Sequence, residues 1–253
     1  MSGRVDIIGL GPGAEDLRCP RAAGALAQAT DLVGYVPYLE RVAEGSGQRI
    51  HGSDNREEIQ RARLALDLAM QGRRVAVVSS GDGGVFGMAA AVFEAMEQGD
   101  PRWRALEVAV HPGVSAVLAA AARLGAPFGN DFCVLSLSDN LKPWGVILNR
   151  LEAAACAGFA MAFYNPISKA RPWQLGEALA RLRRHLPGSV PVIFARAVSR
   201  PEEHVVITTL ADARPEQADM RTLVMVGNAE TRLIPRPGGE PWVYTPRRVG
   251  MDA

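Results

Sequence analysis

Short apolar runs alternate with amphipathic segments through the first half of the chain. Residues 4–9, 31–34, 48–50, 75–78 and 106–110 are typical of strands, because most of these runs are short, apolar and rich in β-branched residues. The intervening residues 20–28, 57–70, 88–98 and the segment after residue 113 have the spacing of helices. Strands that alternate with helices predict a parallel sheet with right-handed crossovers.

The second half keeps the strands but loses the alternation. Residues 132–137, 160–164, 190–195, 204–208 and 222–226 are predicted strands, and residues 143–151 and 170–185 are predicted helices. No helix separates residues 195 and 204, so we expect an antiparallel hairpin in a mixed sheet. The stretch 125–130 is rich in Gly, Pro and Asn, which predicts a domain boundary. We therefore expect an α/β domain over residues 1–124 and a mixed α/β domain over residues 125–253.

Charge and hydropathy exclude two classes of partner. The formal charge is +1 with acidic and basic residues interspersed, so we expect no nucleic-acid partner. No run of 18 apolar residues is present, and the first residues lack the regions of a signal peptide. We expect no membrane association and a cytoplasmic location.

Metal-binding and disulfide patterns are also missing. Cys19, Cys133 and Cys156 are widely spaced, and the four histidines show no metal-ligand spacing. We expect no metal site and three buried, unpaired thiols. His111 differs from the other histidines because it stands at a strand end before Pro112 and Gly113, where either a structural hydrogen bond or an active-site contact is plausible.

Two glycine-rich turns follow apolar strands. The first is GLGPG at residues 9–13, and the second is SSGDGG at residues 79–84. Glycine allows the backbone to approach a ligand closely, and the carboxyl ends of parallel strands are where open α/β sheets bind ligands. The second turn is therefore predicted to form the floor of a small-molecule site.

A nicotinamide-dependent oxidoreductase is the alternative from another class. Gly9, Gly11 and Gly13 resemble a dinucleotide fingerprint, but the next helix begins several residues late, at Pro20. The acidic residue expected at the end of the second strand stands instead at its beginning, as Asp31. The sequence also lacks the nucleotide P-loop signature. These departures favour a large organic cofactor held mainly by backbone groups.

Five segments resemble the tetrapyrrole methyltransferases. They are GLGPG at 9–13, SSGDGGVFGMA at 79–89, HPGVSA at 111–116, SLSDNLKPW at 136–144 and FYNPISKAR at 163–171. The last three are similar to the branch that methylates a precorrin and contracts its ring in cobalamin synthesis. The likeness extends to about Asn228. Cys19 departs from it, because relatives usually carry a threonine there that caps the first helix.

The resemblance implies a homodimer of two-domain α/β chains, with S-adenosylmethionine in the cleft between the domains and S-adenosylhomocysteine as product. It implies these cofactor-binding residues: Gly11, Pro12, Gly81, Asp82, Val85, Phe86, Ser115, Ala116, Tyr164, Asn165, Arg196, Gly227 and Asn228.

The implied reaction is attack of an electron-rich macrocycle carbon on the sulfonium methyl group. It needs alignment and exclusion of water rather than an enzyme nucleophile. Ring contraction also moves protons, so we expect an acid or base among Asp82, His111, Ser136 and Asp139. The partners expected for the carboxylates of the tetrapyrrole are Arg18, Lys142, Lys169 and Arg171. Two alternative substrates stay open, another precorrin and a cobalt-containing intermediate. A tetrapyrrole carrier without catalytic activity is an alternative function.

Overall fold

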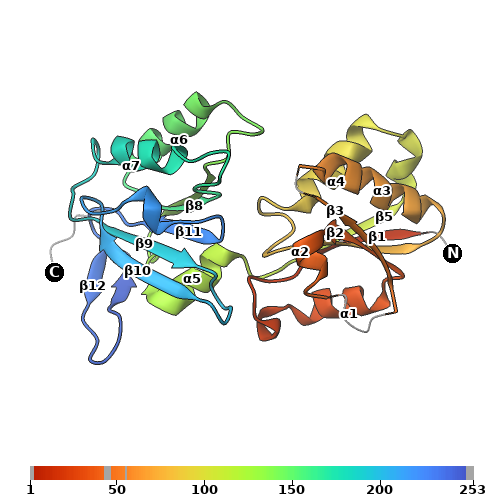
Figure 1. Ribbon diagram of the computed structural model, residues 1–253, viewed down its shortest axis with the longest axis horizontal. Helices are drawn as coiled ribbons and strands as arrows, with labels where there is room; N and C mark the ends of the chain where they lie inside the picture. The colour runs from red at the N-terminus through yellow and green to blue at the C-terminus, as the bar shows by residue number, and fades with distance from the viewer. Residues whose placement is uncertain (1–2, 43–46, 55, 249–253) are drawn as a thin grey trace. The chain divides into compact units, whose positions relative to one another are not determined.

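The computed structural model describes residues 3–42, 47–54 and 56–248. The chain divides into two compact units between Ala116 and Val117 (Figure 1). The expected boundary at residues 124 and 125 lies eight positions later. Helix α5 (Ala116–Leu124) therefore groups almost entirely with the second unit, whereas the sequence placed it in the first.

The first unit contains a five-stranded parallel sheet in the order β3-β2-β4-β1-β5. Its strands are β1 (Arg4–Gly9), β2 (Asp31–Tyr35), β3 (Arg49–Ser53), β4 (Arg74–Ser79) and β5 (Glu107–His111). The helices are α1 (Pro20–Gln28), α2 (Val36–Leu39), α3 (Glu58–Met70) and α4 (Met88–Gln98), with short 3₁₀ turns at Glu15–Leu17 and Pro101–Ala105. The predicted alternation and parallel pairing are confirmed.

Helices cover both faces of this sheet. Ile7 of β1 packs with residues of α3 and α4, whereas its neighbour Ile8 packs with residues of α1. Successive strand residues point to opposite faces, so both must be apolar when both faces are covered. Figure 1 shows α3 and α4 on one side of the sheet and α1 on the other.

The second unit contains a mixed sheet in the order β10-β9-β11-β8-β7. Its strands are β7 (Phe132–Ser136), β8 (Ala160–Tyr164), β9 (Pro191–Arg196), β10 (His204–Thr209) and β11 (Thr222–Val226), with a 3₁₀ turn at Pro215–Gln217 before β11. Strands β9 and β10 form the predicted antiparallel hairpin. Helices α6 (Trp144–Cys156) and α7 (Gln174–Leu182) pack on this sheet through a core that includes Leu151, Phe163 and Leu179. Helix α7 is shorter than predicted, because Ser168 and Arg171 first form a tight backbone bridge.

A small third sheet was not predicted. It joins β12 (Arg232–Ile234), β13 (Trp242–Tyr244) and β6 (Gly125–Ala126), in strands too short to give a periodic pattern. Strand β6 belongs to the Gly- and Pro-rich stretch that we expected to be a boundary. The N–H of Thr245 donates to the carbonyl of Ala126, so this stretch is paired structure within the second unit.

Among the described residues, no helix is both long and apolar enough to cross a lipid bilayer.

A buried carboxylate ties together the amino ends of two strands. Asp31 is fully buried and accepts a hydrogen bond from Arg73 (2.7 Å) and one from the Thr30 hydroxyl (2.8 Å). Nε2 of His51 lies 2.8 Å from the same carboxylate. Burial acts to raise the pKa of Asp31, but the hydrogen bonds from His51, Thr30 and Arg73 outweigh it and hold this pKa below its usual value.

Replacing Asp31 with asparagine should lower the free energy of unfolding by about 2–3 kcal/mol at pH 7, because Arg73 would lose its buried partner. A carboxyl whose pKa is lower in the folded state stabilises the fold above its unfolded pKa, and this contribution is lost as pH falls through the folded value. Urea unfolding should therefore show wild type losing stability below about pH 4. A D31N variant with the same acid sensitivity as wild type would contradict this role.

Cys19, the N-cap residue of α1, does not cap the helix with its side chain. Cys19 has the extended backbone of an N-cap residue, yet it makes no side-chain hydrogen bond to the helix. Replacing Cys19 with threonine should raise the free energy of unfolding by about 1 kcal/mol, because the hydroxyl would accept from a free N–H of the first turn. Urea unfolding measures this change. A Cys19→Val variant is the matched control and should bring no gain.

Candidate functional site

The two glycine-rich turns are joined by backbone hydrogen bonds. The N–H of Gly11 donates to the carbonyl of Gly81 (3.1 Å), and the N–H of Gly81 donates back to Gly11 (2.9 Å). The N–H of Leu10 also donates to Ser79 (2.9 Å). The turns follow β1 and β4, which are neighbours in the sheet, so their carboxyl ends lie side by side. The structure thus brings these predicted segments together.

Asp82 attaches a third segment to this pair. One carboxylate oxygen accepts from the N–H of Gly113 (2.9 Å), and the other accepts from the N–H of Gly84 (2.7 Å). Gly113 belongs to HPGVSA, the segment that follows β5. We expected Asp82 to act on a ligand, but both of its oxygens hold protein backbone. Its carboxylate fixes the shape of the loop cluster, which we define as residues 9–13, 79–87 and 111–116.

Close packing explains why glycine occupies the contact points of the loop cluster. A Cβ added to Gly113 would lie 2.1 Å from the carbonyl oxygen of Gly81 and 2.8 Å from the carbonyl carbon of Gly9. A Cβ on Gly9 would lie 2.6 Å from the backbone nitrogen of Gly113. No side chain fits at these distances, so the three segments can meet only through glycine.

The loop cluster presents apolar side chains next to backbone groups. Val85 is 40% exposed and Phe86 is 55% exposed, although both are large and apolar. Phe86 also has a positive φ of 52°, which is unfavourable for a bulky residue and marks a constrained turn. Ser115 is buried close to Gly81, at the start of α5. An exposed apolar rim beside backbone N–H and C=O groups suits a partly apolar organic ligand.

Two arginines that the sequence did not single out support this edge of the sheet. Arg41 donates to the carbonyls of Leu10, Gly11 and Gly13 at 3.3–3.4 Å and to the hydroxyl of Ser80 at 3.3 Å, so it binds both glycine-rich turns.

The second arginine, Arg61, is buried in α3. It donates to the Ser53 hydroxyl (2.8 Å), to the Asp54 carbonyl (2.7 Å) and to the sulfur of Met88 (3.4 Å). Burial lowers the pKa of its guanidinium. Neither arginine lies in a glycine-rich motif, so only the fold reveals their role.

The structure places His111 at the end of β5 and Arg18 shortly before α1. His111 is buried, and its Nε2 lies 2.7 Å from the carboxylate of Asp6 in the middle of β1, which matches the structural alternative. The Nδ1 atom of His111 and the Nε atom of Arg18 are both buried without a hydrogen-bond partner among the described residues. Arg18 also makes a 3.3 Å bond to Glu15.

In the second unit, predicted residues end three strands of the mixed sheet, β7, β8 and β9. Ser136 ends β7 and is in register with Tyr164, which ends β8, while Arg196 ends β9. These three strands run in the same direction, so these residues share one edge of the sheet. Asn165 has a positive φ of 52° and donates to the Ser136 hydroxyl (3.1 Å). The Tyr164 hydroxyl accepts from the N–H of Val117 (3.0 Å).

Arg171 links the segments that follow β7 and β8. Its side chain is buried and is therefore not exposed to a substrate carboxylate. It is buried and donates to the carbonyls of Leu137 (3.1 Å) and Asn165 (3.2 Å), which follow β7 and β8. Nearby, the buried amide of Gln174 donates to both oxygens of Asp139 (3.2 and 3.3 Å). Sequence reasoning missed Gln174, because it is the first residue of a helix that was predicted to start earlier.

Other predicted residues are placed differently. Arg196 makes a 2.7 Å ion pair with Asp219. Burial acts to raise the pKa of Asp219, but the interactions with Arg196, the N–H of Arg221 and the hydroxyl of Thr222 together lower it. Gly227 and Asn228 follow β11, which runs antiparallel to β8 and β9, so they lie at the opposite edge of the sheet from Tyr164. There Asn228 donates to the carbonyl of Gly158 (2.8 Å). Because β11 is reversed, Gly227 and Asn228 do not share the end of the sheet where Tyr164 and Arg196 lie.

The two predicted lysines remain available for a ligand. Lys142 is half-buried and Lys169 is exposed, and neither makes a hydrogen bond or ion pair with the described residues. Burial and the charge of Arg150 lower the pKa of Lys142.

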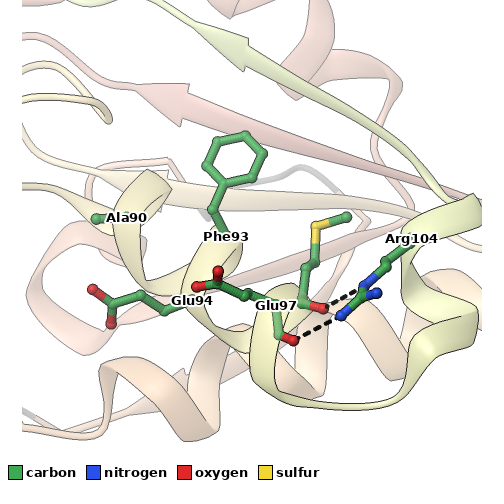
Figure 2. Close-up of a pocket in the computed structure, with 6 residues that line it drawn as sticks. Ala90, Phe93, Glu94, Glu97 and Arg104 are labelled. Atoms are coloured by element: carbon green, nitrogen blue, oxygen red, sulfur yellow. Dashed lines mark hydrogen bonds between the residues drawn. The ribbon is translucent and has the colours of Figure 1, made fainter.

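A surface depression beside α4 contains none of the predicted residues. It measures about 720 Å³ and lies on the outer side of α4, where Phe93 and Glu94 line it (Figure 2). Arg104 closes one end by donating to the carbonyls of Met96 and Glu97 (Figure 2). Its charged lining residues, Glu94, Glu97 and Arg104, belong to none of the predicted site segments, so its size alone does not make it the site.

The family model of the tetrapyrrole (corrin/porphyrin) methylases matches residues 4–214. A precorrin-3B C(17)-methyltransferase from Sinorhizobium sp is 53% identical over 98% of this chain and 97% of its own length. A protein described as a probable cobalt-factor III C(17)-methyltransferase, from Salmonella typhimurium, is 39% identical over 90% of this chain and 93% of its own length.

Solved structures agree with these relatives. The crystal structure of the methyltransferase CobJ matches with a TM-score of 0.92 and 54% identity, over 97% of this chain and all of that one. A uroporphyrin-III C-methyltransferase from Thermus thermophilus, complexed with S-adenosylhomocysteine, matches with a TM-score of 0.70 and 23% identity over 89% and 97% of the two chains. The second likeness establishes a shared fold.

Proposed function

Because the chain belongs to the tetrapyrrole methylases, we propose that it transfers a methyl group from S-adenosylmethionine to C-17 of precorrin-3B and contracts the ring to precorrin-4 in cobalamin biosynthesis. The observation that carries this proposal is the 53% identity, over nearly the full length of both chains, to a protein described as a precorrin-3B C(17)-methyltransferase.

The loop cluster fits the methyl donor. The exposed apolar side chains of Val85 and Phe86, which lie beside the backbone of the glycine-rich turn, match a ligand that combines polar groups with an aromatic base. Pro12, Ser115 and Ala116 complete the set that would hold it in the first unit, with Tyr164 and Asn165 as candidates in the second. When bound, S-adenosylmethionine supplies an electrophilic methyl group. The chain's own contribution is to orient the reactants and exclude water.

In the second unit, the edge formed by Ser136, Asp139 and Tyr164 is the candidate region for proton transfer during ring contraction. Asp139 is partly exposed and is held by Gln174, so it is a fixed carboxylate that can accept a proton. Lys142 and Lys169 make no hydrogen bond or ion pair with the described residues, and their positive charges suit the carboxylates of a precorrin.

The cobalt-containing substrate is the second candidate, supported by the 39% identity to the cobalt-factor III relative. The higher identity to the precorrin-3B relative favours the metal-free form. Incubating the purified protein with each substrate and S-adenosylmethionine separates the two. We expect the product from precorrin-3B to gain the mass of one methyl group and to show the absorption spectrum of precorrin-4. No methyl gain on either substrate would contradict both assignments.

The remaining parts of the proposal are a homodimer, a cytoplasmic location and binding of S-adenosylhomocysteine in preference to NAD. Light scattering after size-exclusion chromatography measures the mass of the assembly, and cell fractionation tests the location. Titration calorimetry compares the two ligands directly. A preference for NAD would instead support an oxidoreductase.

A further inference from the structure

A cysteine, a histidine and a glutamate meet in the second unit, and none belongs to the candidate site. Cys156 ends α6, and Glu152 lies one turn earlier on the same face of that helix. His185 follows α7. Its Nδ1 lies 3.5 Å from the sulfur of Cys156, and its Nε2 lies 3.7 Å from the carboxylate of Glu152. The imidazole therefore stands between a nucleophile and an acid, the arrangement that activates a thiol.

Cys156 differs from the other two cysteines in its exposure. The expectation of three buried thiols was wrong: Cys156 is exposed, and Cys19 and Cys133 are only half-buried. Burial also raises the pKa of the Cys133 thiol, which reduces its thiolate fraction. Cys156 is therefore the sulfur that a molecule in solution reaches most readily.

Glu152 is suited to stabilise a charged imidazole. Arg181 donates a 2.8 Å hydrogen bond to its carboxylate and lowers the pKa of Glu152, so the carboxylate is ionised at neutral pH. His185, which lies outside α6, is the proton acceptor within reach of the Cys156 thiol.

We infer that Cys156 is a site of thiol–disulfide exchange with small disulfides of the glutathione class. The Cys156 thiol gives its proton to Nδ1 of His185, and the sulfur attacks one sulfur of the disulfide. A new S–S bond forms at Cys156 while the old one breaks. The second half leaves as a thiolate, which takes a proton and is thereby reduced as Cys156 is oxidised.

The test exposes the full-length native protein to oxidised glutathione at pH 7 and follows each cysteine by peptide mass spectrometry. Cys156 should form a mixed disulfide before Cys19 and Cys133. The His185→Gln variant should slow this reaction by about threefold or more, because few thiols are ionised without a base. Glu152→Gln should slow it less, and Cys156→Ser should abolish it.

His204→Gln is the matched control, because His204 is an exposed histidine with no contact to a described cysteine. It should react at the wild-type rate. Thermal unfolding checks that each variant is folded, and if His185→Gln is not, Glu152→Gln still tests the arrangement. Wild-type rates in both variants, or faster modification of Cys19 or Cys133, would overturn the inference.

Discussion

Replacing Gly113 with alanine should weaken binding of S-adenosylhomocysteine by at least tenfold and lower the free energy of unfolding by about 1–3 kcal/mol. The added Cβ would stand 2.1 Å from the carbonyl oxygen of Gly81, so one of the two segments must move. A displacement near 1 Å is enough to cost about 100-fold in kcat/KM when it disturbs alignment. Titration calorimetry measures the affinity, and urea unfolding measures the stability.

Gly24→Ala is the matched control for this substitution. Gly24 lies inside α1 with no atom within 4 Å of an added Cβ, so alanine there should preserve binding and raise the free energy of unfolding by about 0.5–1 kcal/mol. Equal affinities for Gly113→Ala and wild type would show that the contact between these loops does not shape the donor site.

Replacing Asp82 with alanine should weaken S-adenosylhomocysteine binding by about 10- to 100-fold. The carboxylate accepts from the N–H groups of Gly84 and Gly113, and hydrogen bonds to a charged group contribute about 1.5–3 kcal/mol each. Without these hydrogen bonds, the Asp82 carboxylate no longer joins the segments 79–87 and 111–116 of the loop cluster. Titration calorimetry gives the dissociation constant directly.

Asp16→Ala provides the comparison, since Asp16 is exposed and makes no hydrogen bond or ion pair with the described residues. It should bind the ligand as wild type does. The role assigned to Asp82 would be refuted by a folded Asp82→Ala protein with unchanged affinity and unchanged turnover.

Local patterns were sufficient for most of the fold. The runs of apolar residues predicted the strands of both large sheets, and the glycines between strand and helix predicted where two of the turns lie. Such features depend only on residues that are close in the sequence. The GLGPG turn, for example, directly follows its strand. The hairpin of β9 and β10 was also predictable, because no helix separates its strands.

The rest depends on pairing between distant segments. The reversed direction of β11 moved Gly227 and Asn228 to the opposite edge of the sheet, and no local pattern indicates strand direction. Arg171 looked like an exposed cation in the sequence, yet the fold buries it against two backbone carbonyls. Arg41 was missed because its partners are backbone atoms about thirty residues earlier and a hydroxyl about forty residues later.

A crystal structure of the protein grown with S-adenosylhomocysteine would locate the donor site directly. We predict that the ligand contacts the segment from Gly81 to Phe86 and the residues around Ser115. Electron density for the ligand elsewhere, with the loop cluster untouched, would contradict the assignment of the donor site.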